Sequence, residues 1–332
     1  AKPADAGRVV GRSMSAARVW FVLLHCAALA GVASALRQAP SDVAPVAPSA
    51  PAPWKEARGP LEAAHVDELW RDESRGRDVP VRIWHPSSGD ALPIVIFSHG
   101  LGGARENYAH LGQHWASHGY AVVHVQHLGS DDAIWRDNAR PLEAAQRAVG
   151  DIENLLNRPR DVSFALDELE RRSRSESWPL RERLDLTRVA VAGHSFGAYT
   201  ALCSAGRDLV IPLSGARVTF HDARIDCAIA MSPQGKDRER SNRSWERFAT
   251  PVLHMTGTRD ESPIRGDATP AERRIPFDTI SKAEQYLLIL EGAQHHAFGD
   301  SPSGRRGARD PAHEPLILSS STAFLDAYLR GD

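Results

Sequence analysis

Apolar and polar residues alternate in two segments on either side of residue 75. The runs "HVDELW" (65–70) and "VPVRIW" (79–84) are separated by the polar stretch "DESRGRD". A period of two is typical of strands with one buried face, and a short polar connection between two such strands favours antiparallel pairing. We therefore expect a hairpin at the start of the folded part of the chain.

Beyond this hairpin, short apolar runs alternate with stretches of helical spacing. The apolar runs are Ile94–Phe97, Ala121–Val125, Val189–Ala192, Ala228–Met231, Val252–Met255 and Tyr286–Leu290. Continuous apolar strands are typical of sheets covered on both faces, and intervening helices are the usual connections between parallel strands. The pattern predicts an α/β fold with a mostly parallel central sheet and helices on both faces.

The polar interval 151–183 contains one clear amphipathic helix. In "DVSFALDELERR", the residues Val162, Ala165, Leu166 and Leu169 fall on one helical face. The arginine-rich remainder of the interval is expected to form a solvated face. Acidic residues interrupt its basic charge, so no nucleic-acid surface is predicted here.

Two further intervals, 207–224 and 261–280, have little periodicity and many Gly, Pro and charged residues. Loops of this length are more often functional than idle. We expect both intervals to lie over an active site and to shape the pockets for the two parts of a substrate.

The first 35 residues resemble a secretory signal. Arg8, Arg12 and Arg18 precede the apolar run "VWFVLLHCAALAGVASA", which ends in small residues at 33–35. Residues 1–13 are interpreted as an extension before a native start at Met14. The alternative is an uncleaved membrane anchor, but the run is shorter than the roughly 20 residues that a spanning helix needs.

Cleavage after Ala35 would leave an exported chain, periplasmic or secreted, with no stable membrane span. Residues 36–60 are rich in Pro and Ala and predict a disordered leader, and residues 61–332 predict one catalytic domain. Residues 1–35 contain four basic side chains and one acidic, so their removal changes the net charge from −2 to −5. This balance indicates no polyanionic partner.

Two cysteines, Cys203 and Cys227, remain in the predicted domain. An oxidising compartment would permit a disulfide between them. Two buried thiols are the favoured alternative, because the sequence does not show the short Cα separation that a disulfide requires.

The segment "VAVAGHSFGAYTAL" (189–202) places a Gly-x-Ser-x-Gly pentapeptide between an apolar strand and a helix of small residues. A nucleophile elbow needs a buried strand, a sharp turn with an exposed serine, and a helix directly after it. Gly193 and Gly197 flank the serine where a Cβ would clash with neighbouring backbone. Ser195 is therefore the predicted nucleophile.

A serine nucleophile needs an imidazole base, and the base needs a carboxylate that orients it. In this fold the chain order is serine, acid, histidine. "TPVLHMTGTRDES" places Asp260 just after an apolar strand, and "YLLILEGAQHHAF" places His295 and His296 after the next one. In many enzymes with a nucleophile elbow, the base is the third residue after a glycine that follows the last strand. Counted from Gly292, this position is His295, which is therefore favoured.

Other carboxylates fit this order less well. Asp226 begins a strand, Asp278 lies in an irregular stretch, and Asp300 follows the histidines. Asp260 is therefore the predicted acid.

An oxyanion hole needs two backbone N–H groups, one from the residue after the nucleophile and one from the loop after an early strand. The amide of Phe196 supplies the first. "VIFSHGLGGARENY" ends a strand in a glycine-rich loop that can present the amide of Leu101. Trp135, in the irregular stretch "GSDDAIWRDN", is the candidate for substrate contact.

No metal and no cofactor are predicted. His99, His124 and His127 lie near two strand ends, but "HVQH" has no third ligand at a recognisable spacing. We expect them to be core or loop histidines.

Five segments together resemble a known family. They are "FSHGLGGARENYAHLGQHWASHGYAVVHVQHLGSD", "RPRDVSFALDEL", "AGHSFGAYTAL", "MTGTRDESPI" and "LEGAQHHAFGD". They are similar to the bacterial predicted dienelactone hydrolases, a branch of the α/β-hydrolase superfamily related to platelet-activating factor acetylhydrolases. The likeness covers roughly residues 66–329. It implies an α/β-hydrolase fold with Ser195, Asp260 and His295 as the triad and Leu101 and Phe196 as oxyanion donors.

The chain departs from its relatives at two positions. Dienelactone hydrolases use a cysteine where Ser195 stands, and plasma-type acetylhydrolases have their acid one strand earlier, where this chain has Ser232. Cutinase-like polyester hydrolases share the elbow and the base loop.

The expected function is therefore hydrolysis of carboxylic esters, with short acyl chains favoured and a small ester or lipid as substrate. The alternatives are a lipase or phospholipase of the acetylhydrolase type, a polyester hydrolase, and a noncatalytic binding protein with the same fold.

Overall fold

The computed structural model describes residues 55, 57–136, 138–211, 214–235, 243–262, 264, 268–300 and 310–332. The chain divides into the units 1–49 and 50–332, and all described residues lie in the second. The predicted signal segment and residues 36–54 and 56 of the predicted leader lie outside the described residues. In the described part of that leader, Lys55 donates a hydrogen bond of 2.6 Å to Asp326.

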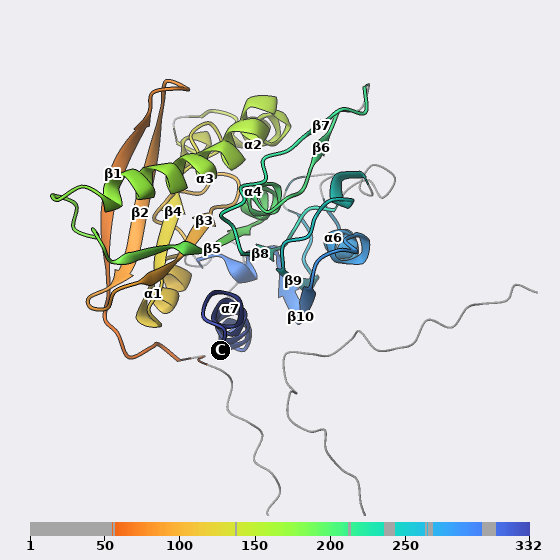
Figure 1. The fold of residues 1–332 in the computed structure, drawn as a ribbon. Helices are drawn as coiled ribbons and strands as arrows, with labels where there is room; N and C mark the ends of the chain where they lie inside the picture. Colours follow the sequence, from red (N-terminus) through yellow and green to blue (C-terminus); the bar gives the residue numbers. More distant parts are fainter. Residues whose placement is uncertain are drawn as a thin grey trace, which may run out of the picture. The chain divides into compact units, whose positions relative to one another are not determined.

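An eight-stranded sheet forms the centre of the described unit, with the strand order β1-β2-β4-β3-β5-β8-β9-β10 (Figure 1). The strands β1 and β2 pair antiparallel, as do β2 and β4, and every other pair in this sheet is parallel. The predicted α/β class and hairpin are confirmed. The strand bounds are β1 Ala63–Asp72, β2 Arg77–Pro86, β3 Leu92–Ser98, β4 Ala121–Val125, β5 Leu184–His194, β8 Cys227–Met231, β9 Val252–Arg259 and β10 Gln285–Gln294.

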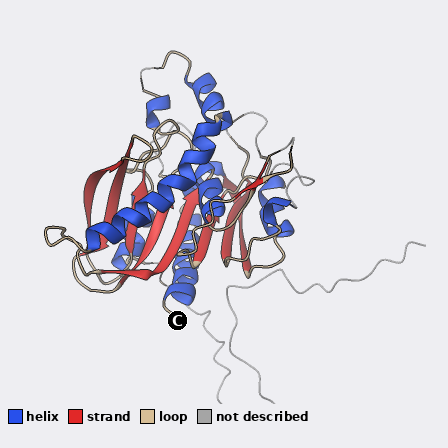
Figure 2. Cartoon of the chain, turned by 45° about the horizontal axis from the view of Figure 1, so that its top comes forward, coloured by secondary structure: helices blue, strands red, loops and turns tan. Residues whose placement is uncertain are grey.

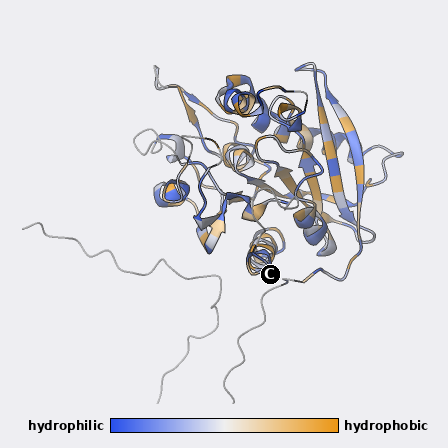
Figure 3. Cartoon of the chain, turned by 180° about the vertical axis from the view of Figure 1, so that it is seen from behind, coloured by the Kyte–Doolittle hydropathy of each residue, from blue (hydrophilic) through white to orange (hydrophobic). Residues whose placement is uncertain are grey.

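The hairpin has the predicted alternation of buried and exposed side chains. Its register pairs His65 with Trp84 and Trp70 with Val79. Trp70 is fully buried, whereas its neighbour Leu69 is 63% exposed. Hydrophobic and hydrophilic residues accordingly alternate along both strands (Figure 3).

The strands contribute side chains to two hydrophobic cores, one on each face of the sheet. On β3, Ile94 and Ile96 pack into the core that includes α3 and α4, and Val95 and Phe97 pack into the core that includes α1 and α7. Figure 2 shows helices on both faces of the sheet. The α-helices are α1 Ala109–Ser117, α2 Pro141–Gly150, α3 Ile152–Ser173, α4 Phe196–Ser204, α6 Ile275–Thr279 and α7 His313–Leu329, and the 3₁₀ turns are η1 Asp132–Ile134, η2 Glu272–Arg274 and η3 His295–Phe298.

The predicted amphipathic helix is present as α3, and its four predicted apolar residues are buried. The expectation that its charged positions all face solvent is wrong. Arg158 is 1% exposed and Asp161 is fully buried. Arg158 donates a hydrogen bond to Ser98, and Asp161 pairs with Arg75 and Arg77. These partners are distant in sequence, so the helical pattern does not predict them.

The interval 207–224 contains two short paired strands, β6 Leu209–Val210 and β7 Arg217–Val218. The interval 261–280 contains η2 and α6. Cys203 on α4 and Cys227 on β8 are buried free thiols, as favoured from the sequence. None of the described helices has the length and apolarity that a membrane crossing requires.

Candidate active site

Ser195 stands in the sharp turn between β5 and α4. Its φ of +56° lies in a region that side chains other than glycine rarely adopt. A Cβ on Gly193 would lie 2.3 Å from the carbonyl oxygen of Gly197, and a Cβ on Gly197 would lie 1.9 Å from that of Ser98. Only glycine fits at positions 193 and 197, two residues before and after the serine. Close backbone packing therefore explains both glycines of the pentapeptide.

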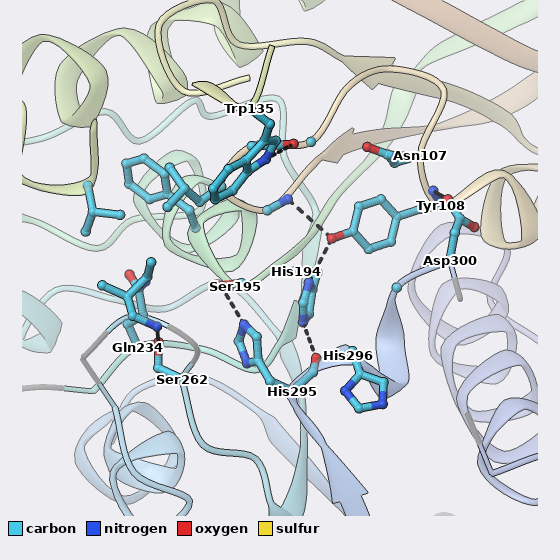
Figure 4. Close-up of a pocket in the computed structure, with 18 of the residues that line it drawn as sticks. Asn107, Tyr108, Trp135, His194, Ser195, Gln234, Ser262, His295, His296 and Asp300 are labelled. Atoms are coloured by element: carbon cyan, nitrogen blue, oxygen red, sulfur yellow. Dashed lines mark hydrogen bonds between the residues drawn. The ribbon is translucent and has the colours of Figure 1, made fainter. Parts of the chain in front are cut away.

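The structure brings Ser195, His295 and Asp260 together at the carboxyl ends of β5, β10 and β9. Nε2 of His295 lies 2.9 Å from Oγ of Ser195, and Nδ1 of His295 lies 2.7 Å from Oδ1 of Asp260. Figure 4 shows the His295 ring pointing toward Ser195 from the end of β10. These are the hydrogen bonds through which a base activates a serine and a carboxylate orients the base.

The environment of Asp260 keeps it ionised. Burial raises the pKa of this carboxyl, but the hydrogen bond from His295 and the electrostatic influence of His295 and Arg273 outweigh burial, so the pKa lies well below its usual range. The hydroxyl of Thr256 donates a further hydrogen bond of 2.9 Å to Oδ2. An ionised acid accepts the Nδ1 proton of His295 and leaves Nε2 free to accept a proton from serine.

Arg273, from η2, is a site residue that the sequence did not reveal. Its side chain is fully buried, and its Nε lies 3.3 Å from Oδ1 of Asp260. The guanidinium also donates to the backbone carbonyl of Asp260 at 3.3 Å and to that of Ser232 at 3.1 Å. Arg273 therefore ties the acid to the end of β8. The sequence around Arg273 contains no recognisable motif, and its partners Asp260 and Ser232 are distant in the chain. For these reasons the sequence did not predict its role.

The two residues whose amides are the predicted oxyanion donors line the same pocket as Ser195. Phe196 is the first residue of α4, and Leu101 lies in the loop after β3. Within the described part of the chain, neither N–H has a hydrogen-bond partner. The Leu101 loop is held by Gly102, whose N–H donates to Ser130 at 2.8 Å, and by Gly103, whose N–H donates to Gly100 at 3.1 Å.

A buried chain of hydrogen bonds connects this loop with the histidine segment. The N–H of Gly100 donates to the hydroxyl of Tyr108 at 3.4 Å, and that hydroxyl lies 2.8 Å from Nδ1 of His194. Nε2 of His194 donates to the carbonyl of His295 at 2.9 Å. Burial lowers the pKa of His194 well below its ordinary value. His194 is thus neutral, and Tyr108 is the donor to its Nδ1 (Figure 4).

A cavity of about 290 Å³ opens beside Ser195. Its apolar lining consists of Leu101, Trp135, Leu142, Val149, Phe196 and Ile264, and its polar side chains include Asn107, Tyr108, Gln234, Ser262, His296 and Asp300. The indole of Trp135 donates to the carbonyl of Gly102 at 2.8 Å, which fixes the ring against the oxyanion loop (Figure 4).

Among the described residues of the two predicted loop intervals, those of 261–280 reach this cavity and those of 207–224 do not. Ser262 and Ile264 line it, whereas no described residue of 207–224 does. The expectation for that interval is wrong in its described part, because its residues pair as β6 and β7 instead.

The rival residues have other partners. Asp226 accepts a hydrogen bond from the N–H of Val189 at 2.8 Å, and Asp278 pairs with Arg274 at 3.1 Å. Asp300 lies 2.9 Å from Nδ1 of His110 and also accepts from the N–H of Tyr108.

Three other histidines lie near the strand ends. His99, His124 and His127 are buried, at 2% exposure or less. Of the residues that the structure describes, no three His, Cys, Asp or Glu side chains are placed to hold a metal ion.

Comparisons with known proteins give a consistent result. The family model described as "Platelet-activating factor acetylhydrolase, isoform II" matches residues 80–150. A platelet-activating factor acetylhydrolase of Cavia porcellus is 30% identical over 286 residues, which cover 74% of this chain and 59% of the relative. Cutinase 1 of Thermobifida cellulosilytica is 25% identical over 216 residues, which cover 65% of this chain and 64% of the relative.

The chain thus spans less than two thirds of the length of these curated relatives. Together with the fold, the matches confirm the predicted resemblance to the serine esterases of the α/β-hydrolase superfamily.

Proposed function

We propose that this member of the α/β-hydrolase superfamily hydrolyses carboxylic esters through an acyl-serine intermediate. The observation that carries the proposal is the pair of hydrogen bonds, 2.9 Å and 2.7 Å, that joins Ser195 to His295 and His295 to Asp260 at the edge of a cavity. The similarity to proteins named acetylhydrolase and cutinase supports the same reaction class.

In the first half of the reaction, Oγ of Ser195 attacks the ester carbonyl carbon while Nε2 of His295 takes the hydroxyl proton. The resulting oxyanion accepts hydrogen bonds from the amides of Leu101 and Phe196. The bond between the carbonyl carbon and the alcohol oxygen then breaks, and His295 returns the proton to the leaving alcohol. Asp260 stays ionised and stabilises the imidazolium throughout.

In the second half, water replaces the alcohol. His295 removes a proton from the water as its oxygen attacks the acyl carbon, and the same amides hold the second oxyanion. Collapse releases the carboxylic acid and returns the proton to Oγ of Ser195. No external oxidant, reductant or metal enters this sequence of steps.

We propose esters with short acyl chains as the preferred substrates. The cavity volume of about 290 Å³ lies at the lower end of the range usual for small-molecule sites. Trp135 and Leu142 lie on its apolar side and would contact the acyl or alcohol group. Lipid esters and polymer esters are the alternative substrates. The dependence of the hydrolysis rate on acyl-chain length distinguishes them from short-chain esters.

The test is labelling of the purified protein with a fluorophosphonate probe. Wild type should be labelled and Ser195→Ala should not. Ser262→Ala, which changes another serine of the same cavity, should keep the label. Hydrolysis rates for nitrophenyl esters of increasing chain length should be highest for the shortest acyl groups. A folded wild type without label would favour the noncatalytic binding protein.

We also propose that the protein is exported, on the basis of the basic and apolar pattern of residues 8–35. Sequencing the N-terminus of the protein recovered from outside the cytoplasm tests this. A mature chain that starts just after residue 35 is expected, and a chain that retains residues 14–35 would contradict cleavage.

A further inference from the structure

We propose that the buried Arg158 is a positioning residue for the oxyanion hole, acting through the two segments that present the amides of Leu101 and Phe196. This inference rests on the proposed function. Arg158 lies on α3, more than 35 residues before the nucleophile, and touches neither Ser195 nor His295 in the described contacts.

The guanidinium donates to the strand end that leads into the Leu101 loop. Its Nη2 lies 3.0 Å from Oγ of Ser98 and also donates to the carbonyl of His99. Its Nη1 donates to Oγ of Ser130 at 2.8 Å. The carbonyl of the same Ser130 accepts the N–H of Gly102. Arg158 therefore contacts both the strand end before the Leu101 loop and the serine whose carbonyl binds Gly102 of that loop.

The same side chain holds the segment with the second amide. Nε of Arg158 donates to Oγ1 of Thr200 at 2.8 Å, and Oγ1 of Thr200 donates to the carbonyl of Phe196 at 3.0 Å. The guanidinium also lies over the Phe196 ring, with 4.4 Å between its central carbon and the ring centroid. The guanidinium donates to four acceptors from three separate nitrogens. A lysine ammonium has only three N–H donors, all on one nitrogen, so it cannot reach all four acceptors in the same geometry.

The helix around Arg158 is adapted to this contact. Pro159 has no N–H, so the carbonyl of Leu155 lacks its usual partner within the helix. That carbonyl accepts the hydroxyl of Tyr199, on α4, at 3.1 Å. One turn of α3 thus binds α4 through Leu155 and through Arg158, so a displacement of this turn would displace the elbow.

A second route connects the same strand end to α3. Oγ of Ser98 lies 2.8 Å from Nε2 of His127, and Nδ1 of His127 lies 3.0 Å from Oδ2 of Asp161. Burial lowers the pKa of His127 well below its ordinary value, and the charge of Arg158 lowers it further. His127 is therefore neutral, donates to Asp161 and accepts from Ser98.

Arg158 retains its charge at this site. Burial lowers its pKa to about 9, which leaves it cationic near neutral pH. Within the described residues, no carboxylate forms an ion pair with it, and all its hydrogen-bond acceptors are neutral oxygens.

The experiment compares Arg158→Met with the matched control Arg330→Met. Arg330 donates to the carbonyls of His118 and Gly119 and lies 4.1 Å from the Tyr120 ring centroid. Like Arg158, it donates to backbone carbonyls and lies over an aromatic ring, but it also pairs with Asp326 at 3.1 Å and is not part of the site described above. The measurements are kcat and KM for nitrophenyl acetate, inhibition by butylboronic acid, and hydrogen exchange in peptides that contain Leu101 or Phe196. The boronate forms a tetrahedral serine adduct with an oxygen in the oxyanion position.

For Arg158→Met we expect kcat to fall roughly 10- to 100-fold with KM within about threefold, because the amides act on the transition state. Boronate inhibition should weaken by a similar factor, and exchange should become faster in both peptides. Arg330→Met should keep kcat and the boronate affinity within about twofold. Arg158→Lys should recover only part of the loss, and full activity of that variant would overturn the hydrogen-bond assignment.

Two further outcomes separate this inference from the proposed function. Unchanged exchange in both peptides of Arg158→Met, with only a lower melting temperature, would overturn the positioning role whatever the activity. An inactive wild type whose Arg158→Met variant shows the faster exchange would overturn the proposed function and leave the positioning role standing. If Arg158→Met does not fold, Thr200→Val removes one acceptor and should show the same changes on a smaller scale.

Discussion

The guanidinium of Arg273 approaches Nδ1 of His295 to 3.1 Å. Nδ1 can donate its proton to Asp260 or accept one from Arg273, but it cannot do both. The contact with Asp260 is shorter, at 2.7 Å, and Asp260 is ionised. The proton therefore points to the carboxylate, and Arg273 acts on His295 through its hold on Asp260.

We expect Arg273→Gln to lower kcat/KM for nitrophenyl acetate by about tenfold, because Asp260 loses a cationic partner and its segment loses carbonyl contacts. It should also lower the free energy of unfolding by about 1–3 kcal/mol, since buried acceptors are left without donors. Steady-state kinetics and urea unfolding measure the two effects.

Arg274→Gln is the control for this prediction. Arg274 is the next residue, but it is 44% exposed and pairs with Asp278 at the surface. Surface pairs of this kind contribute little. Equal losses for the two variants would contradict a specific role for Arg273.

The two adjacent histidines should differ sharply. His295→Ala removes the base, and we expect kcat to fall by about a thousandfold or more. His296 lines the cavity but makes no described contact with Ser195 or Asp260. His296→Ala should change kcat by less than about threefold, with any larger effect in KM. Initial rates at several substrate concentrations give kcat and KM for both variants. A larger loss of kcat in His296→Ala than in His295→Ala would identify His296 as the base.

The residues that the sequence identified share one property. Ser195, Asp260 and His295 each follow an apolar strand, and the carboxyl ends of parallel strands meet at one edge of the sheet. Their chain order and glycine neighbours therefore predict three residues that the structure brings within hydrogen-bond distance of one another. The Phe196 and Leu101 amides could be predicted for the same reason, since both lie at strand ends.

Arg158 and Arg273 could not be predicted in this way. Arg158 is one of several arginines on a helix, and the amphipathic pattern shows only which apolar side chains face the core. Arg273 lies in an irregular stretch whose path depends on contacts with β8 and β10. Their acceptors lie as far as 41 and 60 residues away, as between Arg273 and Ser232 or Arg158 and Ser98. Such contacts depend on tertiary structure rather than on local pattern.

The elbow glycines provide a test of backbone packing. In Gly197→Ala, the new Cβ would lie 1.9 Å from the carbonyl oxygen of Ser98, and backbone cannot move aside as a flexible side chain can. We expect either no soluble protein or a loss of several kcal/mol in unfolding free energy, with no fluorophosphonate label.

Gly150→Ala is the matched control. Gly150 ends α2, and an added Cβ there meets no atom within 4 Å. Alanine is favoured over glycine in a helix by about 0.5–1 kcal/mol, so this variant should be at least as stable as wild type. A stable, fully labelled Gly197→Ala would show that the elbow is looser than described.

His254 is a fully buried residue of β9, and we expect its titration to affect the acid stability of the protein. Burial lowers the pKa of His254 from an ordinary value of 6.5 to about 4. Between these values the unfolded chain binds a proton that the folded chain does not. The stabilisation is therefore complete above pH 6.5 and is lost progressively as the pH falls toward 4.

One such group contributes a slope of up to about 1.4 kcal/mol per pH unit to the unfolding free energy. His254→Asn cannot titrate in this range, so its unfolding free energy should fall less steeply than that of wild type between pH 6.5 and 4. Urea unfolding at pH 8, 7, 6, 5 and 4.5 measures both slopes. Above pH 7 the two curves should run parallel, which serves as the internal control. If the two plots of unfolding free energy against pH are parallel over the whole range, His254 binds its proton equally well in the folded and unfolded states. Burial of His254 would then not contribute to acid lability.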